Sequence, residues 1–311
     1  MTSFGATSTT DDVLEGVDLT GSTFLVTGTS AGLGVETARA LTAHGAKVIG
    51  AVRDVDKARA NLGAAGVDLD RVELREVDLA SLASVRAFTE ALLADGPALD
   101  VIIANAGIMG CPQGTTADGF ETQFGTNHLG HFVLVNRVVP LLRDGGRIVV
   151  LSSAGHRFSD VDLDDPNFER TPYDPWRSYG RAKTANVLFA VELDRRLRDR
   201  SIRATALHPG GIATELGRHL TDESLNQLIA ARGNRPNVWK SVPEGAATQV
   251  WAATVAPADE IGGNFCEDCN VAPVVTDTDE VPGVMGYALD PDSAQALWTR
   301  SEELVGESFP L

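Results

Sequence analysis

Two side chains that could exchange a proton with a substrate, Tyr179 and Lys183, stand four residues apart in the segment Ser178–Lys183. On a helix, residues separated by four positions share a face, so this phenol and this ammonium can approach one site together. Positive charge near a tyrosine favours the phenolate, which makes the phenol a better proton carrier. The spacing therefore predicts acid–base chemistry at a site beside a helix.

A glycine-rich turn lies upstream, in the segment Thr27–Gly34. Gly28, Gly32 and Gly34 follow an apolar run and open a helical pattern, where glycines allow a tight turn and close approach of the backbone to a phosphate. The N-terminus of the following helix would attract the same anion. A generic strand–helix turn is the alternative, but three glycines in one turn favour a phosphate cradle. A pyrophosphate cradle followed by a Tyr/Lys pair predicts an oxidoreductase that uses a nicotinamide cofactor.

The end of the second predicted strand bears on which cofactor is used. An enzyme that binds NAD usually places Asp or Glu there for the ribose hydroxyls, but this chain has Val52 followed by Arg53. A guanidinium suits a 2′-phosphate by its charge and its fork of donors. The alternative is a solvated arginine paired with Asp54 or Asp56. We therefore favour NADP(H), with NAD(H) as the alternative.

Polar residues also follow the next three predicted strands. Asp78, after the third strand, could accept a hydrogen bond from the adenine amine, or could simply be the N-terminal charge of the next helix. The segment Asn105–Gly107 either borders the cofactor cleft or only turns the chain. Ser152 and Ser153 end the fifth strand outside a G-x-S-x-G elbow, which disfavours a hydrolase nucleophile. A serine hydroxyl at this place can instead bond a substrate oxygen.

Short apolar runs alternate with helical patterns and would position these residues. Continuous apolar strands between helices indicate a parallel sheet covered on both faces. We predict an α/β fold, a single doubly wound Rossmann-type domain over residues 19–311, with about seven parallel strands and helices on both faces. The expected strands are Thr23–Thr27, Lys47–Val52, Arg71–Val77, Leu99–Ala104, Arg147–Leu151 and Ile202–Leu207; the expected helices include Ser81–Leu93, Phe120–Leu142, Arg177–Arg198 and Asp292–Leu304.

Two long segments interrupt this alternation, residues 155–176 and 211–242. Both follow the carboxyl ends of strands, where ligands bind in open α/β sheets. We expect them to be substrate loops that close over the site and move without ligand, with Phe158, Trp176 and Leu216 facing the substrate.

Charge and composition exclude several classes of partner. The net charge of −17 opposes non-specific binding to nucleic acid or to an anionic membrane, and no apolar run is long enough for a membrane helix. Three cysteines cannot form a disulfide framework, so a reducing, cytoplasmic setting is expected. Residues 1–12 lack the features of a signal peptide, and residues 1–18 are expected to form a flexible extension.

We expect no metal site. Cys266 and Cys269 form a C-x-x-C pair without a second ligand pair or a thioredoxin context, so two ordinary cysteines are favoured over a metal or redox motif. His128 and His131 lack an acidic third partner at metal spacing and are interpreted as structural.

Together these motifs resemble the short-chain dehydrogenase/reductase family, and most closely its retinol dehydrogenase and protochlorophyllide reductase-like branch. That branch is mostly associated with NADP(H). The matching motifs keep the family's order: TGTSAGLG at Thr27–Gly34, Asp78, NAGI at Asn105–Ile108, NHLGHF at Asn127–Phe132, Ser152–Ser153, YGRAK at Tyr179–Lys183 and HPGGIAT at His208–Thr214.

The resemblance implies a catalytic tetrad of Asn127, Ser153, Tyr179 and Lys183, since the family's serine is usually the second of such a pair. Ala31 departs from the family, because many of its NADP enzymes carry a basic residue there. The implied cofactor-binding residues are Gly28, Ser30, Gly32, Leu33, Gly34, Arg53, Asp78, Leu79, Asn105, Ala106, Gly107, Tyr179, Lys183, Pro209, Gly210, Ile212 and Thr214.

The sequence thus predicts an NADP(H)-dependent oxidoreductase that interconverts a carbonyl (ketone or aldehyde) and an alcohol, on a lipophilic small molecule. The alternatives are an NAD-dependent alcohol dehydrogenase of the same fold and a non-catalytic nucleotide-sensing protein. An epimerase or dehydratase of the extended family is disfavoured by the short chain after His208. Self-association into a homo-oligomer is left open.

Overall fold

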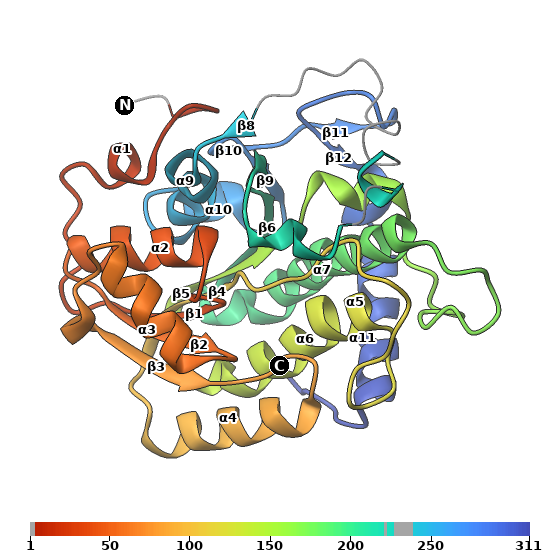
Figure 1. Cartoon of the computed structure of the whole chain (residues 1–311), viewed down its shortest axis with the longest axis horizontal. Coiled ribbons are helices and arrows are strands. Elements are labelled where there is room, and N and C mark those ends of the chain that lie inside the picture. The colour runs from red at the N-terminus through yellow and green to blue at the C-terminus, as the bar shows by residue number, and fades with distance from the viewer. Residues whose placement is uncertain (1–3, 221–222, 227–238) are drawn as a thin grey trace.

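A computed structural model describes residues 4–220, 223–226 and 239–311. A twisted sheet of eight strands forms its centre, in the order β10-β9-β6-β5-β4-β1-β2-β3 (Figure 1). All neighbours in the sheet are parallel except β9 and β10, which are antiparallel. The strands are β1 Thr23–Thr27, β2 Lys47–Val52, β3 Val72–Glu76, β4 Leu99–Ala104, β5 Leu142–Leu151, β6 Arg203–His208, β9 Phe265–Glu267 and β10 Asn270–Val271.

The doubly wound α/β prediction is confirmed, but the main sheet has eight strands where about seven were expected. The turn that joins β9 to β10 has Asp268 and Cys269 at φ 53° and 56°. Non-glycine residues rarely adopt this left-handed conformation, so a two-residue strand after such a turn is hard to recognise from sequence.

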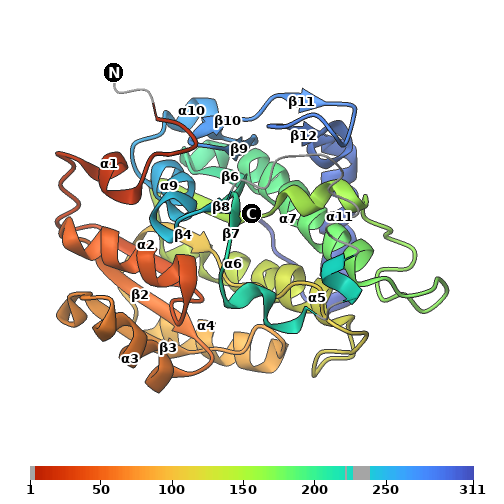
Figure 2. The ribbon, with the colours of Figure 1, turned by 45° about the horizontal axis from the view of Figure 1, so that its top comes forward.

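Helices cover both faces of the sheet because successive strand residues point to opposite sides (Figures 1 and 2). On β1, Leu25 joins one buried cluster, whereas Phe24 and Val26 join the other. The first cluster includes residues of α4, α6, α7 and α11; the second includes residues of α1, α2, α3, α9 and α10. The bounds are α1 Thr10–Leu14, α2 Gly32–Ala43, α3 Val55–Ala64, α4 Leu82–Asp95, α6 Gly130–Val138, α7 Pro175–Leu197, α9 Val242–Ala253, α10 Ala258–Ile261 and α11 Pro291–Val305.

The helix expected over residues 120–142 is interrupted in the structure. A short helix α5, Thr122–Phe124, leads into one π-helical turn, Gly125–Leu129, before α6 begins. Two glycines flank the π turn, and close contacts explain them: a Cβ on Gly125 would lie 2.5 Å from Thr116 Cγ2, and one on Gly130 would lie 2.4 Å from the Leu79 carbonyl oxygen. Periodicity alone does not distinguish such a turn from regular helix.

Part of the segment expected to be a flexible extension, residues 1–18, is helical in the structure, and the flexibility of the extension stays a prediction. Thr9 and Asp12 form a capping box that starts α1. Val13 and Leu14 of α1 are buried, and the helix packs against α2 and α9. Two apolar side chains in a polar stretch are enough to anchor this helix, because each buried aliphatic side chain contributes about 1.5–3 kcal/mol.

Short strand pairs extend the fold beyond the main sheet. Gly211–Ile212 (β7) pairs with Trp239–Lys240 (β8), and Val274–Val275 (β11) pairs with Val284–Met285 (β12). Figures 1 and 2 show the β11–β12 pair beyond β9 and β10, and β12 packs against the short 3-10 helix Ala154–Phe158. No helix in the described ranges is long and apolar enough to cross a membrane. Cys111, Cys266 and Cys269 are buried free thiols.

Candidate active site

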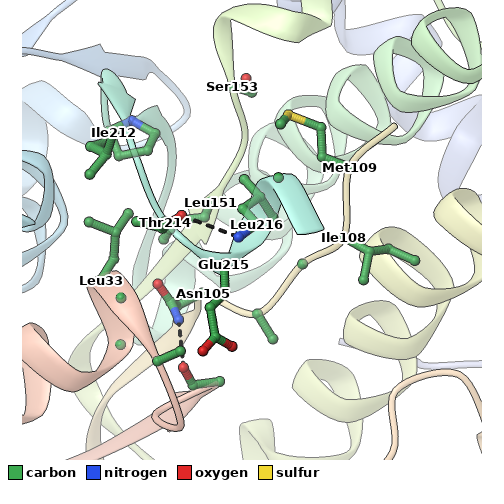
Figure 3. A pocket seen from close by; sticks show the side chains of 18 of the residues that line it. Leu33, Asn105, Ile108, Met109, Leu151, Ser153, Ile212, Thr214, Glu215 and Leu216 are labelled. Carbon is green, nitrogen blue, oxygen red and sulfur yellow. Dashed lines mark hydrogen bonds between the residues drawn. The ribbon is translucent and has the colours of Figure 1, made fainter. Parts of the chain in front are cut away.

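One large pocket, of about 1170 Å³, lies along the carboxyl ends of the parallel strands (Figure 3). Asn127 is the single predicted site residue that does not line it. Leu33 lies toward one end of the view in Figure 3, and Ile108 lies toward the opposite end. The predicted residues that line the pocket are Gly28, Ser30, Gly32, Leu33, Gly34, Arg53, Asp78, Leu79, Asn105, Ala106, Gly107, Ser153, Tyr179, Lys183, Pro209, Gly210, Ile212 and Thr214.

The glycine-rich turn crosses the pocket floor in contact with the end of β4. Gly28 has φ +77°, and a Cβ there would lie 3.0 Å from Ala106 Cα. A Cβ on Gly34 would lie 2.1 Å from the Gly28 carbonyl oxygen, so neither position has room for a side chain. The Asn105 side chain donates to the Thr27 carbonyl oxygen at 2.8 Å and joins the turn to β4.

The N-terminus of α2 opens onto this turn. Its N-cap residue, Ala31, makes no side-chain cap, so no side chain of the cap occupies the first amide groups of the helix. These amides, the absence of side chains at Gly28 and Gly34 and the length of α2 together fit a pyrophosphate. The residues present therefore fit a dinucleotide cofactor.

Two cations stand at the end of the pocket beyond β2. Arg53 is exposed and lines the pocket, and Lys57 of α3 lines it one turn further on. No ion pair joins Arg53 to Asp54 or Asp56 among the residues described; Asp54 instead caps α3 through the Lys57 amide at 2.9 Å. The Lys57 ammonium lies 2.7 Å from the Glu215 carboxylate across the pocket mouth. Arg53 is therefore available to a ligand.

Ser152 and Ser153 differ in the contacts that their hydroxyls make. The Ser152 hydroxyl donates to the Lys183 carbonyl oxygen at 2.7 Å and is committed to joining β5 to α7. The Ser153 hydroxyl accepts from the Gly155 amide at 3.0 Å, and both Ser153 and Tyr179 line the pocket. A Cβ on Gly155 would lie 2.6 Å from Tyr179 Cε1, so the phenol packs directly on this turn.

Tyr179 and Lys183 extend from one face of α7, which starts at Pro175 after the N-cap Asp174. Both are buried, at 2% and 4% exposure. The Lys183 ammonium donates to the Leu151 carbonyl oxygen at 3.0 Å and lies 5.7 Å from the centre of the Tyr179 ring. Burial raises the pKa of Tyr179 to about 12, against the opposing hydrogen bond from Ser153, and lowers the pKa of Lys183 to about 8.

Asn127 lies in the π turn, behind the pocket wall. Its side chain pairs with the backbone of Ile108, accepting from the amide and donating to the carbonyl oxygen, both at 2.9 Å. A Cβ on Gly107 would lie 3.3 Å from Asn127 Oδ1 and 3.6 Å from Lys183 Nζ, so both groups border the space that a side chain here would take. Asn127 therefore fixes the loop after β4 rather than lining the pocket itself.

His128 and His131 are fully buried in the core, and each makes hydrogen bonds there. His128 pairs with the Ser301 hydroxyl at 2.9 Å, and His131 connects the Thr27 hydroxyl to the Asn127 carbonyl oxygen, both at 2.9 Å. Burial lowers the pKa of these imidazoles to about 3 and about 4, so both are neutral. Within the described ranges, no group of three or more His, Cys, Asp or Glu side chains could hold a metal ion.

The pocket is walled by apolar side chains beyond Tyr179. Phe158 and Trp176 meet edge to face at 5.9 Å, and the Trp176 indole donates to the Ser224 carbonyl oxygen at 3.1 Å. This bond joins the two expected substrate loops, although residues 221–222 and 227–238 of the second lie outside the described residues. The apolar wall consists of Ile108, Met109, Phe158, Trp176, Leu216, Leu220, Leu225 and Trp239.

The segment of residues 155–176 is fixed to α7 by a buried cation. Arg181 donates to the Asp165 carbonyl oxygen at 2.8 Å and to Asp162 at 3.0 Å. Its guanidinium also lies 4.1 Å from the centre of the buried Phe168 ring. These contacts favour a fixed pocket wall, and not a mobile lid, for residues 155–176. The mobility of either loop stays a prediction.

Several pocket residues escaped the sequence analysis. Lys57 could have been found from the sequence, because it lies four residues after Arg53 at a predicted helix start. Met109 directly follows the Asn105–Ile108 motif. Thr278 gave no signal, since it lies in a loop-like region far along the chain from every motif and reaches the pocket through tertiary structure alone.

Comparison with known proteins supports the same interpretation. Residues 22–225 match the family model described as short chain dehydrogenase. A probable oxidoreductase of Streptomyces lividans is 44% identical over 91% of this chain and 97% of its own. Human retinol dehydrogenase 14 is 38% identical over 92% of this chain and 87% of its own.

Solved structures show the same architecture. The crystal structure of an uncharacterized protein from Mycobacterium paratuberculosis is 36% identical, covers 98% of this chain and 100% of that one, and superposes with a TM-score of 0.75. A short chain dehydrogenase from Burkholderia cenocepacia, solved in complex with NADP, is 25% identical over 76% of this chain and 91% of its own, with a TM-score of 0.58. The chain therefore belongs to the short-chain dehydrogenase/reductase family, in its retinol dehydrogenase-like branch, and is an NAD(P)-dependent oxidoreductase that acts on alcohol and carbonyl groups.

Proposed function

We propose that this protein is an NADP(H)-dependent oxidoreductase that interconverts a carbonyl and an alcohol on a lipophilic small molecule. The observation that carries the proposal is the position of Tyr179 and Ser153. Both side chains line the pocket and lie against Gly155, where a Cβ would be 2.6 Å from Tyr179 Cε1 and 3.3 Å from Ser153 Oγ. A reacting oxygen beside them could contact both hydroxyls.

The proposed catalytic residues divide the work between proton transfer and charge stabilisation. In the reductive direction, negative charge develops on the carbonyl oxygen. Tyr179 donates its proton to that oxygen. Ser153 receives a hydrogen bond from the Gly155 amide, which leaves its own hydroxyl proton to stabilise the developing charge. The nicotinamide would supply or accept the hydride at its C4 atom.

Lys183 and Asn127 have supporting roles in this proposal. Lys183 holds a positive charge near the phenol, which favours the phenolate needed for alcohol oxidation. Its ammonium has one protein acceptor, the Leu151 carbonyl oxygen, among the described residues, and the remaining protons would reach the nicotinamide ribose. Asn127 fixes Ile108 and Gly107 beside this ammonium, and would hold water for a proton relay.

Two features support a preference for NADP(H). Arg53 and Lys57 give two positive charges at the pocket end where the ribose 2′ position would lie, and neither β2 nor the residue after it supplies a carboxylate. The Burkholderia cenocepacia relative was solved with NADP. NAD(H) remains the alternative cofactor.

The pocket wall supports a lipophilic substrate. Eight side chains beyond Tyr179 are apolar or aromatic, and such a wall gains free energy from burying apolar ligand surface. One relative is named retinol dehydrogenase 14. Cytoplasmic location and the lack of nucleic-acid partners stay predictions, and self-association stays open.

The proposal is tested with a panel of ketones, aldehydes and alcohols of graded apolar size, each with NADPH, NADH, NADP and NAD. The absorbance of the reduced nicotinamide reports turnover. We expect kcat/KM to rise with apolar size and to be higher with NADP(H). Turnover confined to small polar substrates would contradict the substrate class, and a higher kcat/KM with NADH would contradict the cofactor preference.

A further inference from the structure

The C-terminal strap, defined here as residues 273–287, contacts the turn that carries Ser153. It contains β11 and β12 and lies beyond the residues matched by the family model, 22–225. β12 packs against the short 3-10 helix Ala154–Phe158, and Thr278 of the strap lines the pocket. A segment remote in sequence therefore borders both the turn that carries Ser153 and the pocket.

The buried imidazole of His156 connects the strap to the turn that carries Ser153. Its Nδ1 lies 2.7 Å from the Ser153 carbonyl oxygen, and its Nε2 lies 3.1 Å from the Met285 amide nitrogen. A backbone amide can only donate, so Nε2 is the acceptor and the ring proton resides on Nδ1. Nδ1–H therefore donates to Ser153, which fixes both the tautomer and the plane of the ring. Packing against Phe265, with ring centres 5.0 Å apart, holds that plane.

Other bonds anchor the strap to the same turn. The Tyr287 hydroxyl donates to the His156 carbonyl oxygen at 2.8 Å. Arg157 donates to the carbonyl oxygens of Gly283, at 2.6 Å, and of Thr278, at 3.2 Å. The turn and the strap thus form one hydrogen-bonded unit.

These contacts place Ser153 between two anchors. Its hydroxyl is oriented by the Gly155 amide, and its carbonyl oxygen accepts from both the amide and the Nδ1–H of His156. A hydroxyl that stabilises charge must be held within a fraction of an ångström of its working position, because small displacements cost large factors in rate. His156 is not among the described residues that line the pocket, so we assign it no proton transfer.

We propose that His156 is a positioning residue for Ser153 and that the strap fixes its tautomer for this role. The inference rests on the proposed function, since it concerns the rate of the same reaction. It gives the strap residues that bond the turn, Met285 above all, a part in supporting the active site.

Two substitutions at His156 separate its two bonds. The side-chain nitrogen of Asn reaches about as far as Nδ1, so His156→Asn can keep the bond to Ser153. Gln reaches about as far as Nε2, so His156→Gln can keep the bond to Met285 and loses that to Ser153. We expect His156→Gln to lower kcat by roughly 10- to 100-fold with little change in KM, and His156→Asn to recover most of that loss.

A double substitution tests whether the effect passes through Ser153. In a Ser153→Ala background, His156→Gln should reduce kcat no further, because the hydroxyl that it positions is already absent. A full additional loss there would overturn the proposal, as would wild-type kcat in His156→Gln alone. Equal losses in the Asn and Gln variants would show that the bond to Ser153 is not what matters.

Matched controls separate positioning from folding. Val274 lies in the same strap but is 62% exposed, so Val274→Ser should leave kcat and the melting temperature unchanged. Tyr287→Phe keeps the ring and loses only the bond to the His156 carbonyl oxygen, and should lower kcat less than His156→Gln. Cofactor affinity, measured by fluorescence titration, should be unchanged in every variant.

A readout independent of turnover checks the tautomer. In ¹⁵N-histidine NMR spectra, the signal missing from His156→Gln should be that of a neutral ring protonated on Nδ1; an Nε2–H ring would overturn the proposal. Failure of the wild-type enzyme to turn over any substrate of the panel would instead contradict the proposed function, and this spectrum would still decide the tautomer.

Discussion

At the scale of single residues, neighbouring serines of identical chemistry have different tasks. The Ser152 hydroxyl donates a hydrogen bond to the Lys183 carbonyl oxygen, whereas the Ser153 hydroxyl accepts one from the Gly155 amide and can still donate into the pocket. The difference follows from strand geometry, because successive residues at the end of β5 point to opposite faces. The side chain at the second position therefore reaches Tyr179, and the first fastens the helix that carries it.

Tyr179→Phe removes one oxygen atom from the proposed reaction centre. We expect turnover to fall by about 10²- to 10⁴-fold, since the ring still fills its place but the transferable proton is gone. Fluorescence titration should show cofactor affinity close to that of the wild type. A folded Tyr179→Phe variant that keeps most of its activity would remove Tyr179 from the catalytic role.

Lys183 predicts a pH dependence of stability in the absence of cofactor. Burial lowers its pKa to about 8 from its ordinary value of 10.5, so between these values the unfolded chain binds more protons than the folded one. The free energy of unfolding should therefore gain a contribution that rises from about pH 8 to pH 10.5. Tyr179 acts in the opposite sense at higher pH: its raised pKa, about 12 against 10.0, stabilises the fold below pH 10, and this is lost by pH 12.

Chemical denaturation of the wild type and Lys183→Met, at a series of pH values, checks this prediction. Other groups titrate in the same range, so the difference between the two proteins is the informative quantity. Lys183→Met should lack the rise between pH 8 and 10.5. Parallel curves for the two proteins would contradict a lowered pKa of Lys183.

The charge at the end of β2 gives a prediction on cofactor choice. Arg53→Asp replaces an attractive charge by an acceptor for ribose hydroxyls, so NADPH should bind roughly 10- to 100-fold more weakly and NADH more tightly. Lys57→Ala is a useful companion, because it removes the neighbouring charge without adding a carboxylate. The measurement is kcat/KM with both cofactors. An unchanged preference in Arg53→Asp would make Arg53 a surface charge only.

At the scale of elements, the two loops over the pocket differ in how firmly they are held. Residues 155–176 are attached to α7 through the buried Arg181. A described contact of residues 211–220 with the rest of the pocket is the exposed Lys57–Glu215 pair, which is worth little in water. We therefore expect the second loop to be the more mobile one.

Hydrogen exchange with and without cofactor and substrate checks this difference. Residues 211–220 should gain protection on binding, whereas residues 155–176 should be protected in both states. Lys57→Ala should increase exchange in residues 211–220 of the free protein. High and equal protection of both loops in both states would leave them as rigid walls.

The order of strands and helices was predictable because each carries a periodic or continuous apolar pattern. The glycine turn, Tyr179 and Lys183 were recognisable from their spacing. The π turn around Asn127 was not, since its geometry depends on contacts of Gly125 and Gly130 with distant residues. The strap bonds of His156 join positions more than 120 residues apart, and no local pattern records them.

At the scale of the whole molecule, α11 closes the core on the side of α7. Trp298 is 2% exposed and packs edge to face on Phe132, with ring centres 5.1 Å apart. Arg196 of α7 covers the indole, its guanidinium 4.1 Å from the ring centre. The C-terminal helix therefore completes the same hydrophobic core that supports the catalytic helix, which favours the single domain predicted over residues 19–311.

A single domain should unfold in one cooperative transition, and loss of Trp298 should weaken all of it. We expect Trp298→Ala to lower the free energy of unfolding by about 3–5 kcal/mol, because an aromatic side chain is replaced by a cavity. At temperatures where the variant is folded, kcat should stay near the wild-type value, since Trp298 does not line the pocket. Calorimetry and circular dichroism should give coincident transitions for both proteins. Two separate transitions, with only one of them shifted by the substitution, would show that the C-terminal region folds as an independent unit.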